Sequence, residues 1–354
     1  MGTVYKTAID HGWDEHAYTA SVTQKPISIG AALNFRTPIK PGDFPHAKAN
    51  SNGHYSPVVK CTIENVEHLL SRYGITARFD VITKRHQFTG NGMPDDTRTG
   101  GAALAVNARL ESLATLCGIA PSNMQKMANN ISMDNPINPV VDYLSTLKWD
   151  GTDHIKKFAG GIVTDKADTR MRNEIIKLFI IQACAAADWA EKTPNKDAKA
   201  KFEYIPVLYS AQGVQKTKFW NELAPARLRK YFADGLYLDP GNTDSVRNVI
   251  ENWIVELGEL DSTFKASDIS RLKAFTSSGI DTFRTPYDRV AGSYQRRTVV
   301  CGSVNQCDFL RDRTGSRRFW PIQVQSITLP STTSVNLDQV WAQGWHLYMT
   351  GQQW

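Results

Sequence analysis

Apolar residues recur at helical spacing along much of the first half of the chain. In residues 62–75 they repeat every three or four positions, after Thr62 as a helix-capping residue and before Gly74 as a stop signal. Residues 77–90 alternate between apolar and polar positions, which predicts a strand. Further helices are expected over four stretches: 102–119, 122–131, 139–151 and 169–191. This part of the chain is therefore expected to be mostly helical, with one small helix–strand unit.

The pattern changes beyond residues 192–203, a charged stretch marked by a proline, where we place a domain boundary. From there on, short apolar runs alternate with polar loops and helical stretches. The predicted strands are residues 204–210, 253–257 and 297–305, and the predicted helices are residues 218–225 and 268–278. Because strands that alternate with helices usually form a parallel sheet, we expect an α/β core whose sheet is covered by helices.

These patterns divide the chain into four parts. Residues 1–58 contain many proline and glycine breakers and little periodicity, so we expect a poorly structured segment. Residues 59–135 are predicted to form a small helix-rich accessory region, residues 136–200 a helical lead-in, and residues 201–354 the α/β core. A length of 354 residues accommodates two domains or one large one, at roughly 150 residues per domain.

Composition and charge narrow the function classes. The net charge is +6 and the pI about 8.9, a mildly basic balance that suits a polyanionic partner such as DNA but also occurs in proteins without one. The five cysteines are scattered without C-x-x-C spacing, which argues against a zinc or redox motif. No apolar stretch approaches roughly 18 residues and no signal-peptide pattern opens the chain, so we expect a cytoplasmic protein without a membrane span.

The strongest chemical signal is a strand, loop and helix at residues 204–225. A phosphate-binding loop (P-loop) needs backbone N–H groups that wrap the phosphates, a lysine for the β- and γ-phosphates and a hydroxyl for Mg²⁺. The start of the following helix adds partial positive charge. The predicted nucleotide-binding residues are Gln212, Gly213, Val214, Gln215, Lys216 and Thr217. This arrangement predicts a site for ATP and Mg²⁺; the alternative is a chance strand–loop–helix with a surface lysine.

Two positions depart from the usual loop pattern, G-x-x-x-x-G-K-[ST]. Ser210 and Gln215 stand where this pattern has glycine. Glycine before the lysine lets the backbone curl around the β-phosphate without a Cβ in the way. Gln215 must therefore adopt a strained conformation or change the shape of the loop, which leaves weak binding or lost turnover open.

Acidic residues follow the next predicted strand. Glu256 and Glu259 lie at or just beyond the end of the apolar run 253–257. An ATPase needs one carboxylate there for the Mg²⁺ shell and another to orient the attacking water. Both glutamates are therefore candidate metal-site and catalytic residues, and which of them serves the metal is left open. A solvated helix cap or loop is the alternative for an isolated E-x-x-E pair.

Asn305 and two adjacent arginines complete the candidate catalytic set. Asn305 ends the predicted strand 297–305, where an amide can hold the lytic water, although asparagine is also a common turn residue. Arg317 and Arg318 precede the apolar FWPI stretch. A guanidinium that reaches a transferring phosphoryl group can contribute roughly 10³–10⁵ in rate. Surface salt bridges and nucleic acid contacts are the alternatives, and further candidate arginines are Arg284, Arg289 and Arg313.

Six segments, taken in order, resemble the virulence-associated E (VapE) family of phages, prophages and mobile elements. They are PVVDYLSTLKWDG, VLYSAQGVQKTKFW, NWIVELGELD, LKAFTSSGIDTFRTPYDR, RRTVVCGSVNQCDFLRDRTGSRRFWPI and the last helix with Trp341 and Trp345. The resemblance covers roughly residues 138–354. The ordered succession is far more specific than any single segment.

The resemblance implies a P-loop core similar to superfamily 3 helicases and other AAA+-like replication ATPases, with ATP and Mg²⁺ as cofactors. By position it implies phosphate and Mg²⁺ roles for Lys216 and Thr217, acidic-strand roles for Glu256 and Glu259, a strand-end role for Asn305, and the late arginine pair at Arg317 and Arg318.

The resemblance also implies action on DNA during replication of a mobile element, in a bacterial host or phage-infected cell. The expected assembly is a homo-oligomeric ring in which an arginine of one subunit reaches its neighbour's nucleotide, with a primase or other replication proteins as partners. Relatives usually carry glycine where this chain has Gln215. They also usually continue beyond the last helix, so a truncated product is one interpretation.

Two other hypotheses stay open. Ser210 and Gln215 fit a non-catalytic nucleotide- or DNA-binding module with a degenerate loop. The N-terminal region would carry its own metal chemistry if Asp80, His86, Asp95 and Asp96 came together, but their spacing matches no compact ligand pattern, and we favour an accessory DNA- or partner-binding role. Residues 218–232 interleave basic and aromatic side chains, which is compatible with DNA binding, although an ordinary amphipathic helix is the favoured interpretation.

Overall fold

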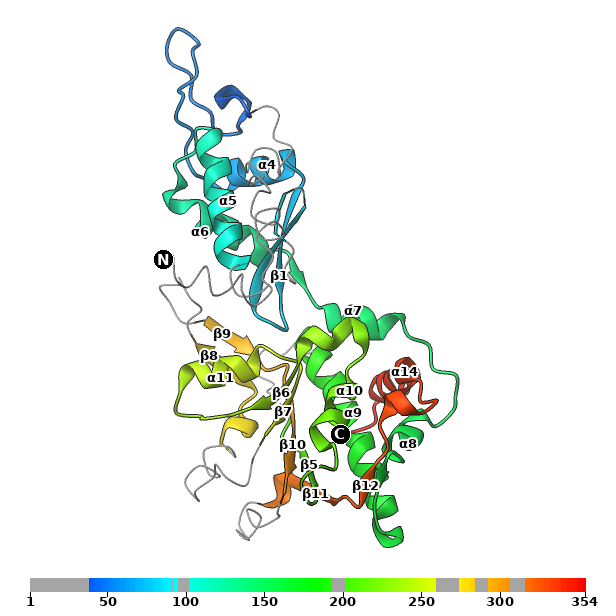
Figure 1. Cartoon of the computed structure of the whole chain (residues 1–354). Helices are drawn as coiled ribbons and strands as arrows, with labels where there is room; N and C mark the ends of the chain where they lie inside the picture. Colours follow the sequence, from blue (N-terminus) through cyan, green and yellow to red (C-terminus); the bar gives the residue numbers. More distant parts are fainter. Residues whose placement is uncertain are drawn as a thin grey trace, which may run out of the picture. The chain divides into compact units, whose positions relative to one another are not determined.

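The computed structural model describes residues 38–90, 92–94, 102–192, 201–258, 274–283, 292–305 and 316–354. The chain groups into two compact units, each of which is described by itself. The first unit comprises Met1–Phe79 and Arg85–Pro136, and the second comprises Asp80–Lys84 and Ile137–Trp354. Figure 1 shows the elements of both units.

Three helices and a β-hairpin form most of the first unit. Its elements are η1 Pro41–Asp43, α4 Ile63–Arg72, β1 Ile75–Asp80, β2 Arg85–Gly90, α5 Ala102–Leu116, η2 Pro121–Asn123, α6 Met124–Met133 and β3 Pro136–Ile137. The predicted helices over 62–75, 102–119 and 122–131 are confirmed. Thr62 caps α4 as expected, because its side chain accepts a hydrogen bond from the backbone N–H of Asn65. The strands pair in the order β2-β1-β3.

Residues 77–90, predicted as a single strand, contain a tight turn and form a hairpin. The Asp80 Oδ1 atom accepts hydrogen bonds from the backbone N–H groups of Ile82 (2.9 Å) and Thr83 (3.2 Å). Lys84 closes the turn in the left-handed region, with φ 57°. An aspartate that bonds the backbone just ahead of it makes a turn without glycine or proline, so the hydrophobic pattern carried no sign of a break.

The second unit holds most of the regular structure. Its helices are α7 Pro139–Thr146, α8 His154–Ala159, η3 Lys166–Asp168, α9 Thr169–Lys192, α10 Lys216–Leu223, η4 Ala226–Tyr231, α11 Thr243–Ile250, η6 Ser316–Arg318, η7 Pro330–Thr332 and α14 Leu337–Met349. Its strands are β4 Ile162–Val163, β5 Ile205–Tyr209, β6 Phe232–Leu236, β7 Ile254–Leu257, β8 Ile280–Phe283, β9 Gly292–Gln295, β10 Val299–Val304, β11 Phe319–Gln323 and β12 Ser326–Ile327.

A five-stranded parallel sheet of order β11-β5-β10-β7-β6 forms the centre of this unit. This confirms the predicted α/β core with a parallel sheet. The three predicted strands correspond to β5, β7 and β10, and the apolar FWPI stretch forms β11. β6 was not predicted, because its sequence FADGL is short and only Phe232 is fully buried, so no apolar run marks it.

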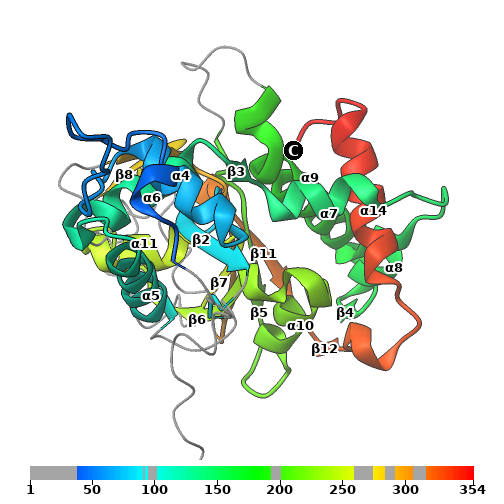
Figure 2. The ribbon, with the colours of Figure 1, turned by 90° about the horizontal axis from the view of Figure 1, so that it is seen from above.

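Helices cover both faces of this sheet. α9, α10 and α14 lie on one side and α11 lies on the other (Figures 1 and 2). Successive side chains of a strand point to opposite faces, and the buried clusters follow this rule. Leu208 and Ile254 belong to the cluster shared with α9 and α10. Val207 and Val255 belong to the cluster shared with α11.

The boundary predicted at residues 192–203 does not separate two compact units, because residues on both sides of it belong to the second unit. Gln182 of α9 exchanges two hydrogen bonds with the backbone of Tyr204 (2.9 and 3.2 Å). The Trp253 indole N–H donates to the Ala183 carbonyl (2.8 Å), which ties α9 to the start of β7. The rest of the four-part division stays a prediction, and residues 1–37 lie outside the described ranges.

Two predicted helices have different outcomes. The helix expected over 139–151 ends at Thr146, since Leu147 is extended (φ −77°, ψ 142°). The helix expected over 268–278 lies mostly outside the described residues. Within the described ranges, no helix combines the length and the apolar character that a membrane span requires.

Candidate functional site

The loop between β5 and α10 leads directly into the start of a helix. α10 forms here because Phe219, Trp220 and Leu223 are buried on one face. The Trp220 indole N–H donates to the Gly302 carbonyl (3.2 Å), which fixes the helix to β10. Among the described residues no side chain caps α10. The first backbone N–H groups of any helix have no intrahelical acceptors, and here no described side chain takes their place. This is the arrangement that binds anions.

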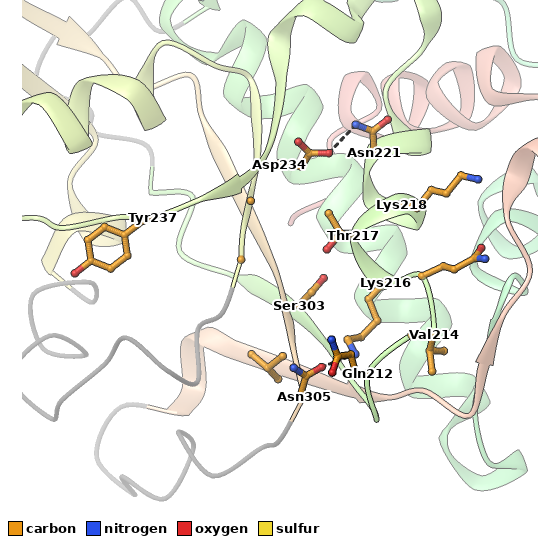
Figure 3. Close-up of a pocket in the computed structure, with 15 residues that line it drawn as sticks. Gln212, Val214, Lys216, Thr217, Lys218, Asn221, Asp234, Tyr237, Ser303 and Asn305 are labelled. Atoms are coloured by element: carbon orange, nitrogen blue, oxygen red, sulfur yellow. Dashed lines mark hydrogen bonds between the residues drawn. The ribbon is translucent and has the colours of Figure 1, made fainter.

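Lys216 is the first residue of α10 and is 7% exposed. Its Nζ atom donates to the carbonyls of Ser210 (3.0 Å) and Ala211 (3.1 Å) and to the Ser210 hydroxyl (3.1 Å). It also lies 3.3 Å from Asn305 Oδ1. Figure 3 shows the lysine side chain running from α10 toward Asn305. The loop therefore holds the amine in place.

Gln215 adopts the strained conformation that was one of the two alternatives for this position. Its backbone lies in the left-handed region, with φ 63° and ψ 29°. This conformation costs a residue with a Cβ about 1–2 kcal/mol and glycine much less. Gly213 in the same loop also has positive φ, at 90°. The loop thus follows a course natural for glycine, although glutamine occupies position 215.

Glu256 of β7 is completely buried and contacts the helix start. Its Oε1 atom accepts a hydrogen bond from the Thr217 hydroxyl (3.1 Å), and its Oε2 atom accepts one from the Gly235 N–H (2.9 Å). Glu256 therefore lies beside the hydroxyl at the start of α10. Glu259 lies outside the described residues, so its role stays a prediction.

Cys301 pairs in register with Glu256 on the neighbouring strand. Burial, and secondarily the charge of Glu256, raise the pKa of the Cys301 thiol well above its ordinary value. The thiol Sγ contacts the Val255 carbonyl at 3.6 Å. It therefore stays neutral and adds no second negative charge beside the glutamate.

β10 brings two polar side chains to the same edge of the sheet. Asn305 follows its last residue, at the strand end that the sequence predicts, and its Oδ1 atom lies close to Lys216 Nζ. Ser303 lies two residues earlier and is 7% exposed, and its hydroxyl has no hydrogen-bond partner among the described residues. Ser303 was not predicted as a site residue, because a single serine inside an apolar strand does not by itself indicate a functional site.

A cavity of about 740 Å³ lies beside these groups, and Glu256 and Cys301 are not among its lining residues. Its volume is within the range of ligand pockets, roughly 300–1,000 Å³. It is lined by Gln212, Gly213, Val214, Gln215, Lys216, Thr217, Lys218, Asn221, Asp234, Gly235, Tyr237, Gly258, Ser303, Val304 and Asn305 (Figure 3). All six predicted nucleotide-binding residues and Asn305 are therefore brought together. Asp234, which accepts a hydrogen bond from Asn221 (2.9 Å), was not predicted because β6 was not.

Strand order explains where the cavity lies. After β5 the chain crosses to β6, which is the edge strand on one side of the sheet. After β10 it crosses in the opposite direction, past β5, to β11, which is the other edge strand. β5 and β10 are neighbours whose connections run in opposite directions, and parallel α/β sheets bind ligands outside the carboxyl ends of such strands.

Arg317 and Arg318 lie at the end of the sheet where the parallel strands begin, opposite the end that holds the cavity. β11 is parallel to β5 with Phe319 beside Ile205, so both arginines lie near the beginning of β5, whereas the loop follows its end. The two ends of the sheet are five strand residues apart, which is about 16 Å. Arg318 bonds to Ser277 (2.7 Å) and pairs with Glu203 (3.5 Å), while Arg317 is exposed. Neither arginine joins the cavity of its own chain.

The remaining candidates that the structure describes are not assembled into a site. Among the described residues no group of three or more histidine, cysteine, aspartate or glutamate side chains could hold a metal ion. Asp80 accepts a hydrogen bond from Tyr231 (2.8 Å), and His86 contacts Ser132 (2.5 Å). Outside the described residues lie Asp95, Asp96, Arg284, Arg289 and Arg313.

The aromatic residues of the stretch 218–232 are core residues. Phe219, Trp220 and Tyr231 are completely buried, whereas the basic Arg227 and Lys230 are exposed. None of these buried rings presents a face on which a base can stack. The burial therefore supports an ordinary helical segment rather than a DNA-stacking surface.

Fold and site together define an α/β protein with a P-loop-like strand, loop and helix at the switch point of a parallel sheet. The model of the virulence-associated protein E-like domain matches residues 144–354. The chain belongs to this family. No curated protein sequence matches it.

Solved structures with a similar fold include three apo structures of the NrS-1 C-terminal region. Two are A forms, both 14% identical, with TM-scores of 0.44 and 0.46; they cover 81% and 84% of this chain and 68% and 69% of theirs. The third is 12% identical, with a TM-score of 0.45, and covers 80% of this chain and 66% of its own. The chain thus spans about two thirds of their length. At TM-scores below 0.5 these likenesses bear on neither activity nor assembly.

Proposed function

We propose that this protein binds ATP with Mg²⁺ and hydrolyses it. The observation that carries the proposal is the chain of contacts from Asn305 to Lys216 on one side of the cavity and from Thr217 to Glu256 on the other. These are the residue types that phosphoryl-transfer sites use for phosphate, metal and water. They come from three parts of the sequence: Lys216, Thr217 and Asn305 line one cavity, and Glu256 is connected to it through its hydrogen bond with Thr217.

The chemistry of the donor set fits a triphosphate and a hard cation. Lys216 and the uncapped start of α10 bind phosphate oxygens. The hydroxyl of Thr217 and the carboxylate of Glu256 would hold Mg²⁺, which prefers oxygen ligands. When bound, such a cation would neutralise negative charge on the transferring phosphoryl group. Asn305 orients water at the strand end, and the buried, unpartnered Ser303 hydroxyl indicates that the cavity is built to receive a further polar group.

In the cell, we propose that hydrolysis drives DNA unwinding or remodelling during replication of a phage, prophage or mobile element. Membership of the virulence-associated protein E-like family and the net charge of +6 support this role. The proposed setting is the cytoplasm of the bacterial host, with a primase or other replication proteins as partners.

The experiment that tests this function is an ATPase assay of the wild-type chain alone and with a panel of single-stranded, duplex and forked DNA. Size measurement by light scattering, with and without nucleotide, tests assembly in parallel. We expect Mg²⁺-dependent turnover that at least one DNA substrate stimulates. Turnover no faster than that of Lys216→Ala under every condition would contradict the enzyme proposal.

The alternative function is a non-catalytic nucleotide- or DNA-binding module, which Gln215 favours. Under the ATPase proposal, Gln215→Gly should change nucleotide affinity and turnover by no more than about threefold. The reason is that the loop holds Gln215 in the left-handed conformation, so the strain belongs to the folded loop with and without nucleotide, and relieving it changes the free energy of unfolding rather than that of binding. Titration with a fluorescent ATP analogue and steady-state kinetics measure both quantities.

Two further variants make this test sharper. Gln215→Asn should resemble the wild type, because asparagine tolerates positive φ, whereas Gln215→Val should lose binding because β-branched residues do not. A gain of tenfold or more in binding or turnover with Gln215→Gly would instead support the non-catalytic module.

We also propose that Arg317 acts on the nucleotide of a second copy of the chain, because it is exposed about 16 Å from the cavity of its own chain. Arg317→Ala should then lower kcat by roughly 10³-fold and leave nucleotide affinity unchanged. Mixing Arg317→Ala with Lys216→Ala should restore part of the activity, since one variant supplies an intact cavity and the other an intact arginine. Arg170→Ala, at an exposed position on α9, is the control. Mixtures that stay inactive would contradict action between copies.

A further inference from the structure

Ser303 presents a buried hydroxyl that the structure leaves without a hydrogen-bond partner among its described residues. The side chain is 7% exposed and lines the cavity. A buried hydroxyl that gains no hydrogen bond on folding destabilises the folded state, so such groups are few and each needs an explanation. Destabilising polar groups are typical of functional sites rather than of cores.

The register of the sheet fixes which way this hydroxyl faces. Cys301 pairs with Glu256, and side chains two residues apart on a strand share a face. Ser303 therefore faces the same side as Glu256 and lies nearer the carboxyl edge of the sheet. Figure 3 shows the hydroxyls of Ser303 and Thr217 directed into the same part of the cavity.

The groups around this space are those that a hydrated cation uses. Thr217 approaches from α10 and bonds to Glu256 of β7 at 3.1 Å. Mg²⁺ takes few protein ligands and keeps several of its waters, which need hydrogen-bond partners of their own. Ser303 is the hydroxyl on the β10 side. It lies two residues deeper in the strand than Asn305, the residue beside the phosphate-directed Lys216.

We propose that Ser303 is a positioning residue for the divalent cation that accompanies the nucleotide, bonding to the water shell of that cation. The inference rests on the proposed nucleotide site and adds a contact on its third strand. A contact from the same hydroxyl to a phosphoryl oxygen is the competing assignment. The two differ in one measurable property, because only the cation contact is lost when the metal is withheld.

The test measures binding of a fluorescent ATP analogue while Mg²⁺ is titrated, and again in excess chelator. For Ser303→Ala the Mg²⁺ concentration at half-maximal binding should rise roughly tenfold, as for the loss of an outer-shell partner of a metal. Binding in chelator should stay at the wild-type value. The thermal midpoint of the ligand-free variant should equal or exceed that of the wild type, because the unpartnered hydroxyl is gone.

Two variants serve as controls. Ser303→Thr keeps the hydroxyl and should keep the Mg²⁺ dependence within about threefold of the wild type. Ser132→Ala removes a buried serine of the first unit that donates to the Asn129 carbonyl (2.7 Å). This variant should show the opposite pattern: a lower midpoint with unchanged Mg²⁺ dependence.

The outcomes that overturn the inference are distinct. An unchanged Mg²⁺ dependence in Ser303→Ala, or a midpoint lowered as in Ser132→Ala, would make Ser303 a structural residue. An equal loss of affinity with and without Mg²⁺ would assign the hydroxyl to a phosphoryl oxygen and overturn the cation contact. Wild-type protein that binds no nucleotide under any condition would overturn the proposed function itself, and the inference with it.

Discussion

Lys216→Ala is expected to lose most of its nucleotide affinity and essentially all turnover. The amine is held by the Ser210 and Ala211 carbonyls at the cavity that we assign to phosphate. A charge-assisted hydrogen bond contributes about 1.5–3 kcal/mol, which corresponds to a roughly 10- to 150-fold loss of affinity. Turnover should fall by at least roughly 10²-fold, because a donor aimed at transition-state charge is removed. Calorimetry and phosphate-release assays measure the two losses.

Two controls separate chemistry from folding in this experiment. Lys216→Met keeps the buried stem without the charge, so it should match Lys216→Ala in binding and be closer to the wild type in thermal stability. Lys218→Ala removes an exposed lysine that lines the same cavity and should weaken binding by no more than about threefold. Equal effects of Lys216→Ala and Lys218→Ala would mean that general positive charge, rather than a placed amine, binds the nucleotide.

Glu256→Gln is expected to abolish Mg²⁺-dependent hydrolysis while leaving Mg²⁺-independent nucleotide binding intact. The two carboxylate oxygens accept from Thr217 and from the Gly235 N–H. An amide has only one acceptor oxygen. Gly235 can only donate, so the amide oxygen must face it and the amide N–H₂ must face Thr217. The Thr217 hydroxyl then accepts a hydrogen bond, and its lone pair is lost to a cation.

The expected size of this effect is roughly a 10- to 100-fold loss of Mg²⁺ affinity, as for other disrupted metal shells. Manganese or magnesium titration of nucleotide binding measures this change, and phosphate release measures turnover. Glu222→Gln is the matched control, because Glu222 lies on α10, the helix of Thr217, and bonds to Ser331 outside the cavity. Turnover by Glu256→Gln near the wild-type rate would remove Glu256 from the proposed mechanism.

The sequence anticipated the elements of the site better than their arrangement. The positions of Lys216 and Thr217 follow from local rules, because an apolar run, a loop and a helix are read from neighbouring residues. Glu256 lies one residue before the end of β7 and Asn305 directly follows β10, near the same end of the parallel sheet. Their contacts with Thr217 and Lys216 depend on strand order, which no local pattern encodes.

The features that could not be predicted depend on long-range packing or on single side chains. The Arg317–Arg318 pair belongs to the opposite edge because β11 runs parallel beside β5, which the chain reveals only when folded. Ser303 supplies a single hydroxyl within the strand VVCGSV, and its proposed role depends on the residues that face it in the folded protein. The turn at Asp80 depends on a carboxylate that bonds its own backbone, a signal weaker than glycine or proline.

The hydrogen bonds from Lys216 to the loop carbonyls, which we call the carbonyl tether, have a consequence for binding kinetics. Because the loop carbonyls hold the amine at the cavity, we expect little chain entropy to be lost when a nucleotide binds. Association should therefore be governed by diffusion and by the local charge, with similar on-rates in variants that leave the tether intact. Differences in affinity among such variants should appear mainly as differences in residence time.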